Sequence, residues 1–273
     1  MNVENFSVLI SVYHKEKPVH ISAALDSVLN QTLLPNEIIL IKDGPLTMAL
    51  DSIIDDYVFR FPDLFKIVPL PDNLGLGLAL NAGLSHCTNE LIARMDTDDI
   101  CYPTRFSKQF SYIRAHPEIS VVGCSIEEFN MVPGDLKRFR KLPSEVNEIM
   151  RFSKYRNPLN HPTVFFRKEH ILKVGSYSDM PLFEDYFLWT RLLKSGYQIT
   201  NLPEPLLHFR TGNDMIGRRH GISYVRKEYR FLTAIKRFQF INTKEFLTAV
   251  FCKLPVRLLP KKVLEFVYKT FLR

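Results

Sequence analysis

The stretch LIARMDTDD, from Leu91 to Asp99, joins a mostly apolar run to three carboxylates within four positions. A short apolar run that ends in a polar turn is typical of a buried strand. Three carboxylates this close repel one another and favour a bound cation, and Mg²⁺ or Mn²⁺ prefers oxygen ligands together with phosphate. Aspartates are equally favoured at the start of a helix. Taken alone, the cluster is compatible with a metal site or with a helix N-terminus.

The residues that precede this stretch alternate between strand and helix patterns. Strands are expected at residues 6–13, 37–42, 65–70 and 91–95, and helices at 18–31, 46–59 and 75–85. This alternation predicts an α/β fold with a mostly parallel sheet and helices on both of its faces. Asp43, Asp72 and the Asp96–Asp99 cluster each follow an expected strand. Ligands bind beyond the carboxyl ends of the strands in such sheets, so we expect the binding site there.

The second half of the chain has a less regular pattern. Strands are expected at 120–129, 161–166, 198–202 and 206–209, helices at 105–115, 169–174 and 183–195, a polar helix or loop at 143–155, and a basic loop at 212–221. Glu184 and Asp185 open the helix at 183–195 among large apolar side chains. Acids at a helix N-terminus have a capping role, whereas a partly buried carboxylate can have its pKa raised toward that of a general base. The pair alone favours capping.

Composition and charge exclude several classes of protein. With 273 residues, 46% of them hydrophobic, the chain is long enough for one sizeable folded domain. The net charge of +7 comes from residues 226–273, which contain twelve Lys/Arg and three Asp/Glu. The core is therefore near neutral, and we expect no nucleic-acid partner. The four cysteines are scattered, which fits reduced thiols in a cytoplasmic protein.

The basic tail has apolar residues near helical spacing. An amphipathic helix of this kind can lie on an anionic membrane surface, and it can equally pack on the preceding domain or on a second subunit. No apolar segment of the chain is long enough to span a bilayer, and no secretory signal pattern opens it. We therefore expect a cytoplasmic protein that is either soluble or attached to a membrane surface from the cytoplasmic side. The sequence leaves a homo-oligomer open.

A set of motifs in a fixed order resembles the family 2 glycosyltransferases. These motifs are FSVLISVYHKEKP, EIILIKDGP, NLGLGLALNAGL, ARMDTDD, HPTVFF and FEDYFLWTRLLKSG. The chain is particularly similar to bacterial exopolysaccharide and O-antigen transferases of the amylovoran type, through KDGPLT and FR-x-GNDM-x-x-RR. The resemblance implies a GT-A fold in residues 1–225, divided into a nucleotide-binding half (1–100) and an acceptor half (101–225), with a helical tail at 226–273.

The resemblance also implies roles for individual residues. Those expected to bind the nucleotide or its diphosphate are Ser11, Val12, Tyr13, Asp43, Asn81, Arg94, Asp96, Arg210, Arg218 and Arg219. Asp98, with Asp96, matches the metal-binding D-x-D motif, Asp185 matches the catalytic base, and Glu184 would support that base. His161 and Asp99 are expected near the donor or acceptor sugar. Many relatives have two acids after the second strand, whereas this chain has Lys42 and Asp43.

The expected function is a metal-dependent, inverting transfer of a sugar from a nucleotide sugar, with UDP as the expected nucleotide, to a hydroxyl of a lipid-linked oligosaccharide. Mn²⁺ or Mg²⁺ would be the cofactor, and the implied acceptor favours a peripheral position at the inner face of the cytoplasmic membrane. One alternative is a nucleotidyltransferase, but the glycine- and Arg/Lys-rich signature of that class is missing after the first strand. Another is a non-catalytic sugar-binding protein of the same fold. Intact Asp96, Asp98 and Asp185 argue against it.

Overall fold

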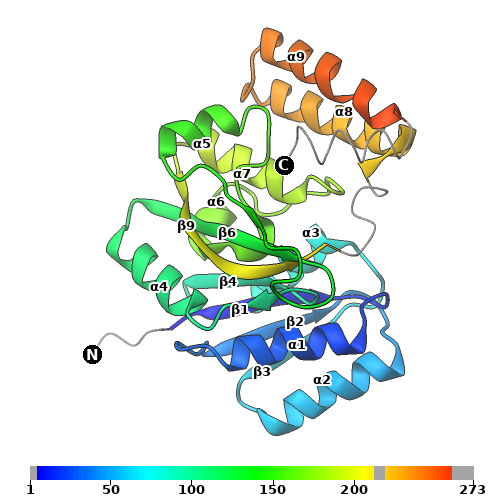
Figure 1. The fold of residues 1–273 in the computed structure, drawn as a ribbon, viewed down its shortest axis with the longest axis vertical. Helices are drawn as coiled ribbons and strands as arrows, with labels where there is room; N and C mark the ends of the chain where they lie inside the picture. Colours follow the sequence, from blue (N-terminus) through cyan, green and yellow to red (C-terminus); the bar gives the residue numbers. More distant parts are fainter. Residues whose placement is uncertain (1–4, 212–218, 260–273) are drawn as a thin grey trace.

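A computed structural model describes residues 5–211 and 219–259. The protein folds into a mixed sheet that is flanked by helices (Figure 1). Along the described part of the chain the strand order is β3-β2-β1-β4-β8-β6-β9-β5, with β7 paired to β6. The first four strands are parallel, as expected for a mostly parallel sheet. Beyond β4 the pairing becomes mixed: β8 is antiparallel to β4 and β6, whereas β6 and β9 are parallel.

The first half folds as its apolar pattern predicts. Its elements are β1 Ser7–Val12, α1 Pro18–Leu29, β2 Glu37–Lys42, α2 Met48–Arg60, β3 Phe65–Pro69, α3 Leu76–His86 and β4 Leu91–Asp96. Leu9 and Ile39 face the core that contains α3, while Val8, Ile10 and Ile38 face the core that contains α1, α2 and α4. Because both faces of the sheet are covered, the strands are nearly continuous apolar runs rather than alternating ones.

The second half departs from the sequence pattern in several places. Its elements are β5 Ile100–Cys101, α4 Arg105–Ala115, β6 Ile119–Phe129, β7 Arg138–Arg140, α5 Val146–Phe152, β8 Phe165–Arg167, α6 Lys168–Lys173, α7 Glu184–Lys194 and β9 Gln198–Arg210. The prediction of a strand at 161–166 is wrong at its start, where His161–Thr163 forms a 3₁₀ turn. Pro162 has no N–H to donate to a ladder, and the N–H of Thr163 donates to Asn160 O at 2.9 Å.

Strand β9 corrects a second expectation. We expected two strands at 198–202 and 206–209, separated by prolines, but Gln198–Arg210 is one strand. The ladder with β6 is irregular at Cys124 and Ser125, opposite the segment that contains Pro203 and Pro205. An irregularity of this kind absorbs prolines without ending the strand. The strands β5 and β7 were not predicted.

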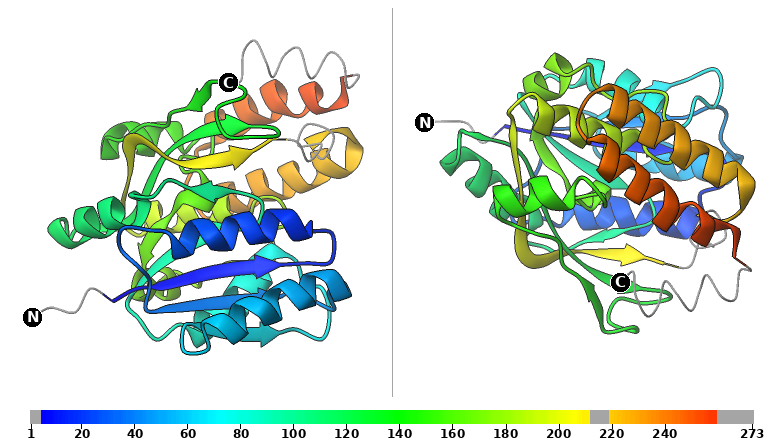
Figure 2. Two further views of the ribbon diagram at one scale, coloured as in Figure 1. Left: turned by 60° about the horizontal axis from the view of Figure 1, so that its bottom comes forward. Right: turned by 90° about the horizontal axis from the view of Figure 1, so that it is seen from above.

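In the described part of the tail, helix α8 packs against α7 and α9 packs against α8. They are α8 Gly221–Arg237 and α9 Thr243–Lys253, followed by a 3₁₀ turn at Pro255–Leu258. The two helices lie side by side (Figure 2, right). The Phe231 ring of α8 stacks on Phe183 at 4.9 Å between centroids and lies 4.5 Å from Tyr186. Helix α8 runs across the expected boundary at residue 225, so the division into domain and tail stays a prediction.

None of the helices in the described ranges has the length and hydropathy that crossing a bilayer requires. The four cysteines are unpaired, and Cys87, Cys101 and Cys124 are buried.

Candidate active site

The D-x-D turn follows β4 directly and is held by two arginines. Arg94, itself 1% exposed, binds Asp96 with two nitrogens, and its Nη1 lies 2.7 Å from Asp96 Oδ2. Arg210, at the end of β9, donates its backbone N–H to Asp99 Oδ1 at 2.9 Å and its Nε–H to the Asp98 carbonyl at 2.9 Å. Both ends of the acidic turn are therefore fixed by the sheet.

Asp98 has the electrostatic properties of a cation ligand. Burial, the charge of Asp96 and the charge of Glu16 raise the pKa of its carboxyl to about 7. Asp96, Asp98 and Asp99 each place a carboxylate oxygen within 4.8 Å of the others. Such a set of hard oxygen ligands, in which the negative charges repel one another, fits Mg²⁺ or Mn²⁺. Because Arg94 already binds both carboxylate oxygens of Asp96, Asp98 is better placed than Asp96 to bind a cation.

Asp99 has a different environment from Asp98. It has no exposed surface, and among the described residues its Oδ2 has no hydrogen-bond partner. Burial, followed by the charges of Asp98 and Asp96, raises its pKa well above the ordinary value. In this structure its carboxylate fastens the turn to β9, and the expected contact with a sugar stays a prediction.

The second acidic site lies at the start of α7. Asp185 is 9% exposed, and its Oδ2 accepts a hydrogen bond from Asn157 Nδ2 at 2.6 Å. Burial raises the pKa of Asp185, while the hydrogen bond from Asn157 and the charges of Arg94 and Arg219 oppose that rise. The result is a carboxylate that is held in one orientation and is more basic than an exposed aspartate, as a general base requires.

Glu184 stands beside Asp185 but is held differently. Among the described residues its Oε2 is buried without a hydrogen-bond partner. Burial, followed by the charge of Asp185, raises its pKa to about 7. Helix α3 approaches this residue closely at Gly77, where an added Cβ would lie 3.0 Å from Glu184 Cβ. Any larger residue at position 77 would therefore press on Glu184 where the two helices meet.

Arg94 connects the two acidic sites electrostatically. Its charge lowers the pKa of Asp98, Asp99, Glu184 and Asp185, so one buried guanidinium acts on the carboxyl groups of both sites. His161 lies in the same region, with Nε2 3.0 Å from Tyr177 Oη. Burial and the charge of Arg94 lower the pKa of His161 well below its ordinary value, so the imidazole is neutral at pH 7.

Two residues that were expected to bind the nucleotide form hydrogen bonds to neighbouring loops instead of pointing freely into the site. Asp43 accepts hydrogen bonds from the backbone N–H groups of Leu74 (2.7 Å) and Gly75 (3.2 Å) and from the Asn73 side chain. Asn81 donates to Tyr177 O at 2.6 Å and accepts from Tyr177 N at 2.9 Å. Both side chains support the rim of the expected nucleotide site, and direct contact with nucleotide stays a prediction.

The other expected nucleotide residues lie at the end of β1 and in the basic loop. Val12 is fully buried, whereas Tyr13 is 39% exposed and Ser11 is partly exposed beside Asp96 in the parallel register. Arg218 lies outside the described residues. Arg219 is described, and its charge acts on Asp185 and on Arg140.

Two residues of the site were missed in the sequence. Glu16 accepts a hydrogen bond from Thr97 Oγ1 at 2.7 Å and raises the pKa of Asp98. Its position after β1 was a usable signal, because β1 and β4 are neighbours and their following loops meet at one edge. Asn157 gave no such signal, since an asparagine before a proline is typical of any turn.

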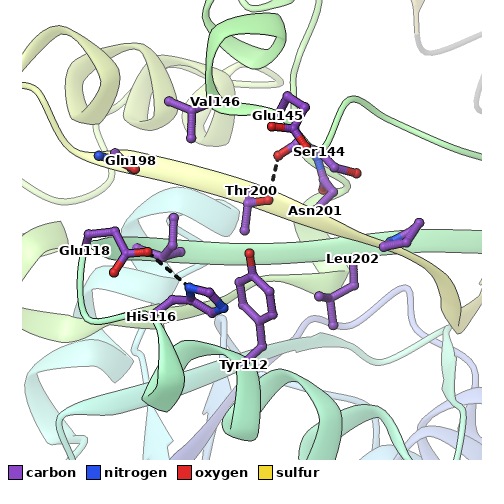
Figure 3. A pocket seen from close by; sticks show the side chains of 12 residues that line it. Tyr112, His116, Glu118, Ser144, Glu145, Val146, Gln198, Thr200, Asn201 and Leu202 are labelled. Atoms are coloured by element: carbon purple, nitrogen blue, oxygen red, sulfur yellow. Dashed lines mark hydrogen bonds and ion pairs between the residues drawn. The ribbon is translucent and has the colours of Figure 1, made fainter.

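A separate pocket lies at the opposite ends of β6 and β9 (Figure 3). It is lined by Tyr112, His116, Thr200 and neighbouring residues, and His116 Nδ1 lies 3.1 Å from Glu118 Oε1. The lining includes none of the predicted site residues that the structure describes. Nothing in its chemistry connects it to the carboxylates at the other edge of the sheet.

Comparison with known proteins identifies the family. The profile of Glycosyl transferase family 2 matches residues 7–175. The amylovoran biosynthesis glycosyltransferase AmsE of Erwinia amylovora is 43% identical over 97% of this chain and 98% of its own length. A UDP-Gal:alpha-D-GlcNAc-diphosphoundecaprenol beta-1,3-galactosyltransferase of Escherichia coli is 36% identical over 98% of this chain and 96% of its own.

Solved structures agree on the fold. TarS of S. aureus, residues 1–349 in complex with UDP-GlcNAc, superposes with a TM-score of 0.67 at 17% identity and covers 93% of this chain and 72% of that chain. The mannosyltransferase PcManGT of Pyrobaculum calidifontis, in complex with GDP-Man and Mn²⁺, gives 0.66 at 15% identity, with coverage of 97% and 75%. These likenesses confirm the GT-A fold. The profile spans more than half of the chain and relatives match along nearly all of it, so this protein is a glycosyltransferase that belongs to glycosyl transferase family 2.

Proposed function

We propose that the protein is a metal-dependent, inverting glycosyltransferase that moves a sugar from a UDP-sugar to a hydroxyl of a lipid-linked oligosaccharide in the synthesis of a bacterial surface polysaccharide. The observation that carries this proposal is the pairing of two acidic sites around Arg94, one suited to a cation and one to a proton. The names of the E. amylovora and E. coli relatives support the pathway and the acceptor class.

The donor would lie at the D-x-D turn, in the half formed by residues 1–100. Asp98, with Asp96 beside it, would hold Mn²⁺ or Mg²⁺, which supplies positive charge for the departing diphosphate when bound. Arg210 fixes the turn, and Asp43 fixes the loop after β3 on the nucleotide side. Arg219, and Arg218 beyond the described residues, would add cationic charge near the leaving group.

The acceptor would meet Asp185 in the half formed by residues 101–225. Asp185 takes the proton from the attacking hydroxyl, while Asn157 holds the carboxylate in place. Glu184 and the neutral His161 border this position and would contact a sugar. Attack from the face opposite to the leaving diphosphate inverts the anomeric centre in one step. The β-1,3 product in the name of the E. coli relative is of the kind this step forms from an α-linked donor.

The C-terminal helices suit attachment to a membrane surface from the cytoplasmic side. Helix α8 packs on the first turn of α7, so it adjoins the proposed acceptor site. Several large apolar side chains of this region are exposed, among them Ile222 (58%), Phe251 (72%) and Leu258 (54%). Exposed apolar groups among basic residues bind anionic bilayers through both hydrophobic and electrostatic contributions.

A panel of nucleotide sugars with Mn²⁺ or Mg²⁺, assayed for released nucleoside diphosphate, tests the proposal. We expect slow, metal-dependent release of UDP from one donor, faster with a lipid-linked acceptor. Release of inorganic diphosphate would instead indicate a nucleotidyltransferase. Absence of both turnover and metal-dependent nucleotide binding would indicate a non-catalytic protein.

Flotation with phosphatidylglycerol vesicles tests the membrane surface. We expect a Phe251→Ser, Leu258→Ser variant to float less than the unchanged protein. The control is Phe59→Ser, which removes an apolar side chain that is even more exposed (85%) from α2 at the other end of the molecule. Equal flotation of all three proteins would contradict attachment through the C-terminal helices.

A further inference from the structure

The hairpin formed by residues 130–141, which joins β6 to β7 and includes β7, presents a contiguous apolar tip to solvent. Met131 is 76% exposed and Val132 is 61% exposed, and the next residue, Pro133, is exposed as well. The donor and acceptor chemistry described above uses none of these side chains. Exposed apolar residues that adjoin one another, unlike scattered ones, indicate an interaction surface. We call residues 130–141 the β6–β7 hairpin.

The tip of the β6–β7 hairpin has a defined backbone. The Asp135 carboxylate accepts hydrogen bonds from the backbone N–H groups of Met131 at 2.8 Å and Asn130 at 3.1 Å. The Asp135 N–H in turn donates to Val132 O at 3.1 Å. Gly134, which lies between them, supplies the left-handed φ of +88° that closes the turn. The two apolar side chains are therefore displayed by an ordered loop, which lowers the entropic cost of binding a partner.

The charge of the β6–β7 hairpin is strongly positive. Its twelve residues contain four Lys/Arg and one acid, Asp135. The N–H of Met131 and those of its neighbours hold the pKa of Asp135 below its ordinary value, because they stabilise the charge of its carboxylate. Arg138 is paired with Glu128. Lys137 and Lys141 are exposed, and neither forms an ion pair with another described residue.

An apolar tip with cations behind it matches the surface of an anionic bilayer. The tip can enter the boundary between headgroups and acyl chains, while the ammonium groups of the lysines lie among the phosphate groups. The one acid of the β6–β7 hairpin does not oppose this contact, since its carboxylate binds the N–H groups of its own loop. A bilayer therefore satisfies both the apolar and the cationic parts of the surface.

The base of the β6–β7 hairpin is joined to the D-x-D turn. Arg210 donates from Nη1 to Asn130 O at 3.3 Å and from Nε to Asp98 O at 2.9 Å. The N–H of Thr211 donates to Phe129 O at 2.8 Å. A bilayer that contacts the β6–β7 hairpin would therefore lie beside the edge of the sheet where the donor is expected.

We propose that the β6–β7 hairpin is a membrane contact in which Met131 and Val132 enter an anionic bilayer and Lys137 and Lys141 bind its phosphate groups. This inference rests on the proposed function in so far as that function places the acceptor in a membrane. It adds a contact in the acceptor half of the chain, separate from the C-terminal helices. It also gives the edge of the sheet that carries the D-x-D turn a fixed position near the bilayer.

Tryptophan fluorescence tests this contact directly. The chain has one tryptophan, Trp189, which is fully buried, so a Val132→Trp variant adds one exposed indole. We expect its emission to move to shorter wavelength with phosphatidylglycerol vesicles, and lipids brominated on their acyl chains to quench it, because the indole leaves water. Leu34→Trp is the matched control. Leu34 is 55% exposed and precedes β2 at the opposite edge of the sheet, so neither change is expected there.

Flotation of the full-length protein separates the two contributions. We expect Met131→Ser, Val132→Ser and, separately, Lys137→Gln, Lys141→Gln to weaken binding to phosphatidylglycerol vesicles by roughly 10-fold each. The lysine variant should bind neutral phosphatidylcholine vesicles as weakly as the unchanged protein does.

The control for lost charge is Lys66→Gln, Lys194→Gln, since both lysines are exposed and lie outside the β6–β7 hairpin. This variant should float like the unchanged protein. Metal-dependent UDP binding in solution should be equal in all of these proteins and shows that each is folded.

Three outcomes would overturn this inference. The emission of Val132→Trp could stay unshifted while the protein floats, which would leave the C-terminal helices as the membrane contact. Sedimentation could reveal a dimer that dissociates in Met131→Ser, Val132→Ser, which would assign the tip to a subunit interface. The unchanged protein could also fail to float. Release of UDP from a donor in solution needs no vesicle, so it tests the proposed transferase activity separately.

Discussion

The acidic turn after β4 and the acidic pair at the start of α7 contain the same kinds of side chain in two different environments. In the turn, Asp98 is surrounded by other acids, and their charges add to the effect of burial on its pKa. In the pair, Asp185 is buried near aromatic residues and accepts hydrogen bonds from the Asn157 side chain and from the backbone N–H of Tyr186. Repulsion among the acids of the turn favours a cation, whereas burial among apolar side chains favours a proton on the carboxylate of the pair.

The comparison teaches that the role of a carboxylate follows from its neighbours rather than from its sequence motif. Both sites lie near the buried Arg94, whose charge lowers the pKa of each. What separates them is the number of acids nearby and the hydrogen bonds each can accept. Four variants test this distinction, and we describe them from the largest expected effect to the smallest.

Asp185→Asn should separate proton transfer from donor binding. The amide keeps the size of the carboxylate but cannot accept the proton of the acceptor hydroxyl, so we expect kcat to fall by about 10²–10⁴-fold. Metal-dependent UDP binding should be unchanged, as measured by calorimetry with Mn²⁺. Near-normal turnover in this variant would remove Asp185 from the role of base.

Asp98→Asn should weaken donor binding as well as turnover. Loss of one anionic ligand weakens the hold on a divalent cation, and we expect UDP affinity in Mn²⁺ and turnover both to fall roughly 10²-fold. UDP binding measured with EDTA should change little. If UDP affinity in Mn²⁺ stays as in the unchanged protein, Asp98 is not a metal ligand.

Asn157→Ala should alter the acid pair without touching the turn. The hydrogen bond from Asn157 lowers the pKa of Asp185, so its loss raises that pKa and leaves the base protonated up to a higher pH. We expect the acidic limb of the kcat/KM profile to move to higher pH. The matched control is Asn89→Ala. It removes a 3.1 Å hydrogen bond to Ser7, which lies at the start of β1 and away from the acid pair. Equal profiles for all three proteins would contradict the positioning role of Asn157.

Glu184→Gln should have a small, pH-dependent effect on stability. Burial raises the pKa of Glu184 from an ordinary value of 4.5 to about 7, so the folded state binds more protons than the unfolded state between these values. The free energy of unfolding therefore falls as pH rises through this range. We expect the variant to be more stable than the unchanged protein at pH 8, by on the order of 1 kcal/mol, and similar to it at pH 4.5.

Thermal unfolding at the two pH values measures this effect. The exposed Glu148 offers the control substitution Glu148→Gln, which should give no difference that depends on pH. The stability difference between Glu184→Gln and the unchanged protein could also be the same at pH 8 and at pH 4.5. That result would mean that the charge of Glu184 does not destabilise the folded protein.

The first half of the fold could be predicted because each strand is a continuous apolar run covered on both faces. The observed β2, Glu37–Lys42, has the bounds expected from EIILIK. The second half contains segments whose conformation depends on distant partners. Strand β5 has two residues and pairs with β9, which lies about a hundred positions further along the chain. β9 continues through two prolines because the ladder with β6 is irregular there.

The site was predictable only in part, for a similar reason. The D-x-D turn and the acid pair were located by motifs, but the partners that give them their properties come from other segments. Asn157 meets Asp185 across 28 positions, and Thr97 meets Glu16 across 81. No local pattern encodes the contact of Asn157, whereas the position of Glu16 after β1 places it at the same edge of the sheet as Thr97. Asp43 illustrates the converse, since a residue chosen for nucleotide binding has its carboxylate occupied by the turn at Leu74 and Gly75.

The close approach of α3 to α7 at Gly77 has a consequence for recombination between homologous enzymes. A chimera joined near residue 100 inherits position 77 from one parent and position 184 from the other. A Cβ at position 77 would lie 3.0 Å from Glu184 Cβ and 3.4 Å from Ser178 O, so the start of α7 would have to give way by a few tenths of an ångström. Glu184 and Asp185 are the residues that such a displacement would move. The best matched parents for such a chimera are therefore those in which the donor-side partner contributes a glycine at this position.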